Sequence, residues 1–246
     1  MIRAMADKDG YISVSEFYSS TKKNETRKSA YQYFNDKYVK TPFENYFIIE
    51  EESRFEARKL NFFLPGSIYM FGYPNPINKD ILSYYDKRPM IIIIGSFFAK
   101  TTGRYILQGI NLNFVPEKQK VVLLDTYQRT FNKDLREAER NSDIGLIGQA
   151  KNIAKYLKDW ALMTTVFVNR GKIPLNFAVR NYDIKGVLNP VLIELEDWPM
   201  IPFFVPRELE GISPAQVYAE YAIAKRSAGT KMIDKVRSEA NKKRFK

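Results

Sequence analysis

The sequence contains neither cysteine nor histidine among its 246 residues. Without cysteine the chain can form no disulfide, no thiolate nucleophile and no structural zinc or iron–sulfur site. Without histidine it has no imidazole general base, and it lacks the commonest metal ligand. These two absences exclude most hydrolase, redox and zinc-enzyme classes and leave carboxylate or magnesium chemistry for an enzyme. We therefore expect a protein that is not an enzyme and that uses no cofactor.

Long apolar runs are also missing. The isoleucines Ile91–Ile94 are followed at once by Gly95 and Lys100, whereas a membrane span needs roughly 18–20 apolar residues. Asp7 and Asp9 interrupt the N-terminus where a secretory signal would need its apolar stretch. We expect a soluble, unexported protein with no membrane partner.

Positive charge is in excess. Lysine and arginine number 39 against 28 aspartates and glutamates, which gives a net charge of +11. Such an excess favours polyanionic neighbours, most commonly nucleic acid, because each neutralised phosphate releases counterions. A solubilising surface, or a basic subunit packed against acidic subunits, would explain the same charge. The cations cluster most densely at Lys242, Lys243, Arg244 and Lys246, around the single ring of Phe245, and this cluster is our first candidate for binding phosphates.

The sequence patterns predict an α+β fold. The alternation of residues 106–114 places Ile110, Leu112 and Phe114 on one face of a strand, with Asn111 and Asn113 on the other. The apolar run 89–95 is typical of a strand buried on both faces. Helices are expected over residues 26–40, 116–140, 143–160 and 213–224, and strands over 68–71, 89–95, 106–114, 164–168, 190–195 and 201–205.

The same patterns divide the chain into three parts. Residues 1–61 are expected to form a helical or extended N-terminal arm, in which Tyr31, Phe34 and Tyr38 fall one helical turn apart. Residues 62–224 are expected to form the α+β core, built on a small antiparallel β-barrel or sheet. Residues 225–246 are expected to form a basic C-terminal tail.

One segment is similar to a calcium-binding loop. In residues 7–17, Asp7, Asp9 and Glu16 stand where an EF-hand places ligands, and Gly10 stands at its sharp turn. The first ligand position would fall on Met5, which has no side-chain oxygen. We therefore predict a polar turn that caps the first helix, and no metal.

Carboxylates could also hold Mg²⁺ for nuclease chemistry. Glu194 and Glu196 flank Leu195 and would share one face of a strand, but no Glu-x-Lys pattern of a two-metal nuclease follows them. A solvated sheet face is the preferred interpretation, and a magnesium nuclease is kept as an alternative. The other acids considered are Asp80, Asp86, Asp125, Asp134 and Asp197.

A set of ordered motifs between residues 64 and 213 resembles a family of tailed-bacteriophage virion proteins. The motifs are Pro65–Phe71, Ser83–Ile91, Gly109–Pro116 and Leu123–Asp125, followed by Ile193–Leu195, Trp198 and Phe203–Glu208. The family is known as the DNA end protector proteins of T-even-like contractile phages.

The resemblance implies a virion structural protein, made in the host cytoplasm, that binds double-stranded DNA ends or lies beside them in the head–neck region. Its partners would be other virion proteins such as those of the portal, neck or baseplate. The alternative is a tail, baseplate or neck subunit that contacts only other virion proteins. Tyr84 and Tyr85 could form a platform that stacks on bases, or could pack in a turn in which Asp86 accepts backbone N–H bonds.

Overall fold

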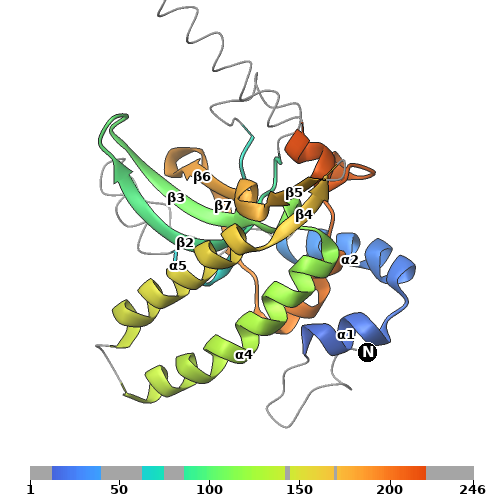
Figure 1. Ribbon diagram of the computed structural model, residues 1–246, viewed down its shortest axis with the longest axis horizontal. Helices are drawn as coiled ribbons and strands as arrows, with labels where there is room; N and C mark the ends of the chain where they lie inside the picture. The colour runs from blue at the N-terminus through green and yellow to red at the C-terminus, as the bar shows by residue number, and fades with distance from the viewer. Residues whose placement is uncertain (1–12, 40–62, 75–85, 142–144, 169–170, 220–246) are drawn as a thin grey trace, which may run out of the picture.

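A computed structural model describes residues 13–39, 63–74, 86–141, 145–168 and 171–219 (Figure 1). Its centre is a five-stranded antiparallel sheet of order β6-β3-β2-β1-β7. The strands of this sheet are β1 (Ile68–Gly72), β2 (Met90–Ala99), β3 (Arg104–Asn111), β6 (Val179–Asp183) and β7 (Leu188–Leu192). A separate hairpin contains β4 (Thr165–Val168) and β5 (Gly171–Pro174).

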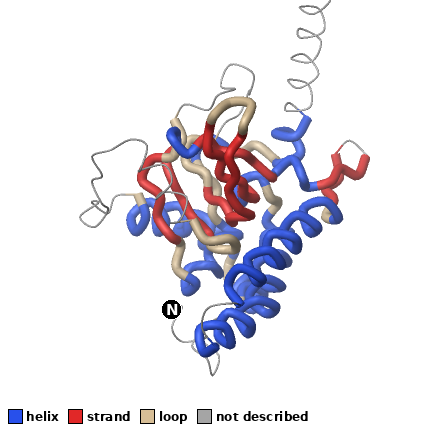
Figure 2. The backbone as a smooth tube through the Cα atoms, turned by 90° about the vertical axis from the view of Figure 1, so that its left-hand side faces the viewer, coloured by secondary structure: helices blue, strands red, loops and turns tan. Residues whose placement is uncertain are grey.

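The helices around the sheet include α1 (Val14–Ser20), α2 (Lys23–Tyr38), α4 (Glu117–Asn141) and α5 (Gly145–Met163). Short 3₁₀ segments join the elements: η2 (Leu112–Phe114), η3 (Leu175–Ala178), η4 (Ile184–Gly186), η5 (Leu195–Phe203) and η6 (Arg207–Leu209). Helices α4 and α5 form a long pair whose far end projects beyond the sheet, as Figures 1 and 2 show. No helix in the described part of the chain is long and apolar enough to cross a membrane.

The expected α+β class and the antiparallel sheet are confirmed, but the sheet is not closed into a barrel. β6 pairs with β3 and β7 pairs with β1, so the two strands lie at opposite edges. Pro190 lies within β7 and has no N–H to offer a further strand, which suits an edge position. The sheet is therefore open.

The first half of β2, residues 90–94, is buried on both faces, as the continuous apolar run 89–95 predicts, whereas the second half is more exposed. Met90, Ile92 and Ile94 belong to the larger core cluster, which includes residues of α1, α2, α4 and α5. Ile91 and Ile93 point to the other face, into a smaller cluster in which half of the buried residues are aromatic. Successive side chains of a strand point to opposite faces, and this places the two sets of residues in different clusters.

The first two helices pack on this core. Val14 and Phe17 of α1, and Phe34 and Tyr38 of α2, are buried in the larger cluster, and Tyr31 packs against its edge. The predicted aromatic stripe is confirmed as a packing face. The described part of residues 1–61 thus contributes to the core, while the division of the chain at residues 61 and 224 stays a prediction.

Two expected strands are corrected. Residues 201–205 do not form a strand, because Pro199 and Pro202 fix φ and remove backbone donors; residues 201–203 end the 3₁₀ helix η5, and residues 204–205 follow it outside any helix or strand. The strand expected over 106–114 ends at Asn111, whose side-chain oxygen accepts a hydrogen bond from the N–H of Asn113 and starts η2. The predicted division of faces survives this change, since Ile110, Leu112 and Phe114 all enter the larger cluster.

Candidate nucleic-acid interface

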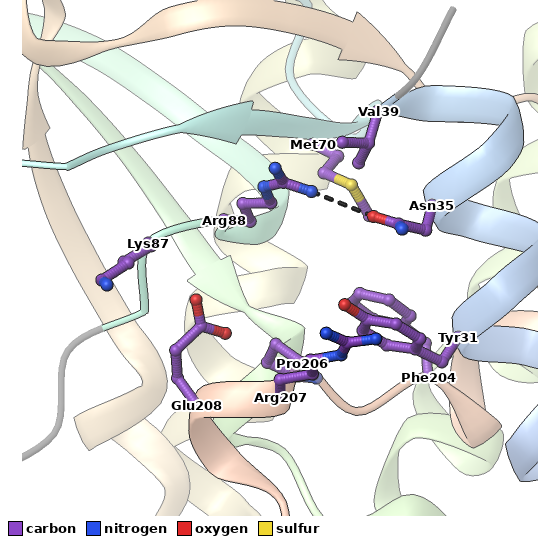
Figure 3. A pocket seen from close by; sticks show the side chains of 10 residues that line it. All are labelled: Tyr31, Asn35, Val39, Met70, Lys87, Arg88, Phe204, Pro206, Arg207 and Glu208. Atoms are coloured by element: carbon purple, nitrogen blue, oxygen red, sulfur yellow. Dashed lines mark hydrogen bonds between the residues drawn. The ribbon is translucent and has the colours of Figure 1, made fainter.

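A pocket of about 350 Å³ opens where three segments distant in the sequence meet. One wall is α2, another is the segment that leads into β2, and the third runs from the end of η5 into η6; Met70 of β1 also lines the pocket (Figure 3). The residues that line it are Tyr31, Asn35, Val39, Met70, Lys87, Arg88, Phe204, Pro206, Arg207 and Glu208.

The polar lining of this pocket is mainly cationic. Lys87, Arg88 and Arg207 carry three positive charges, and Glu208 carries one negative charge, so the lining has a net charge of +2. All four side chains belong to exposed residues. Within the described ranges no ion pair neutralises any of the three cations. The pocket is therefore suited to an anion.

The two arginines are held from different sides. The Nη1 atom of Arg88 donates a hydrogen bond to the side-chain oxygen of Asn35 at 3.0 Å. The guanidinium of Arg207 lies 5.2 Å from the ring centroid of Tyr31, and that ring stacks in turn on Phe204 with an interplanar angle of 2°. Arg88 and Asn35 lie on one side of the pocket, and Tyr31 and Arg207 on the other (Figure 3). A guanidinium stacked on a ring keeps its in-plane N–H groups available for a ligand.

A buried carboxylate fixes the backbone at Arg88. Asp86 accepts a bond from the N–H of Arg88 at 2.9 Å and side-chain bonds from Asn111 at 3.2 Å and Asn113 at 2.5 Å. Burial raises the pKa of Asp86, and the three hydrogen bonds act in the opposite direction. The expectation that Asp86 accepts a backbone N–H is confirmed.

A buried lysine fixes the opposite wall. The Nζ atom of Lys120, on α4, donates to the backbone oxygen of Phe204 at 3.0 Å. Burial lowers the pKa of Lys120 to about 8, against the smaller opposing effects of Glu117 and Asp86. The position of the chain before Arg207 thus depends on a polar contact made inside the core.

Helix α2, the first of the three walls, is tied to η5 by Asp197. This carboxylate is buried and accepts bonds from Tyr33 at 2.6 Å, from Lys37 at 2.7 Å and from the hydroxyl of Tyr38. Burial disfavours the charge on Lys37, but its hydrogen bonds to Asp197 and Glu194 outweigh that effect and raise its pKa. All three walls of the pocket are therefore positioned by buried or half-buried polar contacts.

Asp80 and the side chain of Asp134, two of the carboxylates considered for magnesium, lie outside the described part of the structure, and the described carboxylates make separate contacts. Asp86 and Asp197 act as described above, Asp125 accepts bonds from the hydroxyls of Ser13, the N-cap of α1, and of Ser15 on that helix, and Glu194 pairs with Lys37. Glu194 and Glu196 do not share a strand face, because both lie at the start of η5. In the ranges that the structure describes, no three potential metal ligands come together.

All six residues predicted to bind DNA lie outside the described residues. These are Tyr84 and Tyr85 and the tail residues Lys242, Lys243, Arg244 and Lys246. In the sequence, Tyr85 directly precedes Asp86, so the proposed aromatic platform adjoins the segment that carries Lys87 and Arg88. Asp7 and Asp9 of the calcium-like loop also lie outside, and Glu16 is an exposed residue of α1.

The pocket itself was missed by sequence reasoning. Lys87, Arg88 and Arg207 belong to motifs that we used only to recognise a family, and Tyr31 was assigned only to packing. No spacing rule connects residues of α2 with residues near position 207, because the pocket is created by the long-range packing of α2 on η5. The local signal was limited to the adjacent cations Lys87 and Arg88 before Pro89, and to the single Arg207 after Pro206.

Comparison with known protein families matches residues 7–141 to the family described as "Phage T4 terminal DNA protecting protein". The matched range begins before α1 and ends with α4, and it contains six of the pocket residues: Tyr31, Asn35, Val39, Met70, Lys87 and Arg88. Searches of curated proteins and of solved structures found no match. The match covers more than half of the chain, and the protein therefore belongs to the phage T4 terminal DNA protecting protein family.

Proposed function

We propose that this protein binds the ends of linear double-stranded DNA in the phage particle and covers them without catalysing any reaction. The observation that carries the proposal is the family match over residues 7–141. The net charge of +11 and the cationic pocket support it, because DNA ends are polyanionic. A position in the head–neck region, beside portal or neck proteins, would place the protein where a packaged DNA end lies.

An exonuclease assay tests this function directly. Linear duplex is incubated with the protein, challenged with an exonuclease, and the surviving DNA is measured. We expect protection when the protein is present in slight excess over ends. Unlabelled linear duplex should compete for the protein, whereas a closed circle of the same sequence should compete poorly, because only the linear DNA has ends.

The same mixtures test the absence of catalysis. Linear duplex with Mg²⁺ and no added nuclease should remain intact. Equal competition by circles and linear fragments at moderate salt would contradict end binding. Magnesium-dependent cleavage that is lost in Glu194→Gln or Asp197→Asn would contradict a purely structural role.

A second candidate function is that of a structural subunit that contacts only other virion proteins. The hairpin of β2 and β3 favours it, because Phe97 and Phe98 are 45% and 49% exposed near the tip. Exposed aromatic side chains are typical of protein contact surfaces. If this function is the correct one, a Phe97→Ser, Phe98→Ser double variant should lose incorporation into particles, and the wild-type protein should show no preference for DNA ends.

A further inference from the structure

We propose that the pocket between α2, Lys87–Arg88 and Arg207 binds the terminal phosphate monoester of a DNA strand. This inference rests on the proposed function and specifies which part of the DNA end is recognised. The ligand group is a phosphate that is attached to the strand through one oxygen only, and it is the same at a 5′ and at a 3′ terminus.

Charge favours a terminal phosphate over an internal one. The lining has a net charge of +2, from Lys87, Arg88 and Arg207 against Glu208. A phosphate monoester carries about −1.5 to −2 at neutral pH, whereas each internal diester carries about −1. The monoester therefore matches the charge of the pocket more closely than the phosphates along a duplex.

The arrangement of donors also fits such a group. Arg88 and Arg207 lie on opposite sides of the pocket (Figure 3), so one phosphate can be approached by both guanidinium groups. Arg207 stacks on Tyr31, and no hydrogen bond to its guanidinium is found among the described residues, so its edge can face a ligand. Edge-on hydrogen bonds to phosphate oxygens are the strong contacts of arginine.

The pocket is held in shape before any ligand binds. Asp86 fixes the N–H of Arg88, and Lys120 fixes the carbonyl of Phe204, from inside the protein. A site that needs little reordering loses less free energy on binding. This positioning distinguishes the pocket from lysines scattered on the exposed face of a helix, such as Lys151 and Lys155 of α5.

The enclosure favours a strand terminus. A volume of about 350 Å³ is near the lower end of the range for small-ligand pockets. A terminal phosphate carries the strand on one side only, whereas an internal phosphate carries it on both sides and needs more room.

The experiment compares blunt duplexes of one sequence that differ only at their termini: 5′-phosphate, 3′-phosphate, or hydroxyl at both ends. Binding to the full-length protein is measured at fixed, moderate salt. We expect at least one phosphorylated duplex to bind about tenfold more tightly than the hydroxyl duplex. The phosphorylated duplex that binds more tightly identifies whether the 5′ or the 3′ terminus is recognised.

Three variants test the assignment of the pocket. Arg88→Gln and Arg207→Gln should each abolish most of the preference for the phosphorylated duplex. Glu208→Gln removes the negative charge and should strengthen binding of that duplex. Lys151→Gln removes one exposed positive charge outside the pocket and serves as the matched control, with its preference retained. The affected residues are exposed, so melting temperatures should stay close to that of the wild type.

The outcomes separate this inference from the proposed function. If the protein prefers linear DNA to circles but binds phosphorylated and hydroxyl ends equally, the terminal-phosphate site is overturned and end binding stands. If the preference for phosphate survives both arginine variants, the pocket is overturned as its location. If linear DNA and circles bind equally, the proposed function fails, and this inference fails with it.

Discussion

The buried ammonium of Lys120 donates a hydrogen bond to the backbone oxygen of Phe204 at 3.0 Å, from the core side of the pocket wall. The neighbouring segment carries Arg207 on the ring of Tyr31. A charged residue inside the core thus positions a basic residue at the surface. Because the ammonium of Lys120 can lose its proton, the unfolding free energy of the protein depends on pH.

The unfolding free energy of the wild type should rise relative to that of Lys120→Met as the pH increases. Below a pKa of about 8, Lys120 is charged in both states and the cost of burying the charge is fully present. Between that value and its ordinary value of 10.5, the unfolded chain binds the proton and the folded protein does not. From pH ~7 to ~9.5 the gain should be about 2 kcal/mol.

Urea unfolding of both proteins across this pH range checks the prediction. Subtracting the two curves removes the contribution of buried tyrosines such as Tyr182, whose pKa is raised by burial. A difference that stays constant or falls with pH would contradict a buried lysine with a lowered pKa.

Replacing Asp86 by Asn should destabilise the protein by about 1–3 kcal/mol, because the amide nitrogen cannot accept the bonds now made by Asn111, Asn113 or Arg88. Chemical denaturation measures the loss. Glu196→Gln, at an exposed position of η5, is the control and should change stability little. If the Asp86 variant were as stable as this control, the carboxylate would not be needed to hold the pocket segment.

Gly66→Ala should be destabilising by roughly 2 kcal/mol or more. Gly66 has φ of +88°, a conformation that side chains rarely adopt, and an added Cβ would lie 1.9 Å from the hydroxyl of Tyr127. Gly95→Ala is the matched control, since an added Cβ there meets no atom within 4 Å. Thermal unfolding should therefore separate the two variants clearly, and equal melting temperatures would argue against the close packing of Tyr127 on this turn.

Deleting residues 241–246 should weaken DNA binding and reduce the slope of log K against log salt by about one unit for each phosphate that the tail neutralises. The reason is that Lys242, Lys243, Arg244 and Lys246 would no longer release counterions. Titrations at several salt concentrations give the slope. An unchanged slope, combined with impaired particle assembly, would assign the tail to a neighbouring protein instead.

The aromatic platform is tested by Tyr84→Ser, Tyr85→Ser. Loss of base stacking should weaken binding to duplex ends by about 1–3 kcal/mol per stacked base and leave the salt slope unchanged, since no charge is removed. Affinity measured over the same salt series would show this parallel shift. Unaltered affinity in a folded variant would contradict base stacking and favour the alternative that the two tyrosines only pack in a turn.

Several elements were determined by the sequence itself. The unbroken apolar run of β2 and the helical spacing of Phe34 and Tyr38 correctly predicted buried faces, because periodicity depends only on residues that are close in the chain. Ser213 caps the helical residues 214–219 by accepting a bond from the N–H of Gln216, as its position before Pro214 predicts. The ordered motifs of residues 65–125 also identified the correct family.

Tertiary structure alone decided how the sheet ends and where the pocket lies. Closure into a barrel depends on whether two edge strands meet, and β6 and β7 lie at opposite edges. The pocket depends on α2 packing against η5 through Asp197, which brings Tyr31 to Arg207. Contacts of this kind join residues more than 150 positions apart, as between Tyr33 and Asp197, and local patterns hold no information about them. The sequence therefore indicated a cationic protein of a DNA-protecting family, and only the long-range packing of buried polar residues placed three of those cations around one cavity.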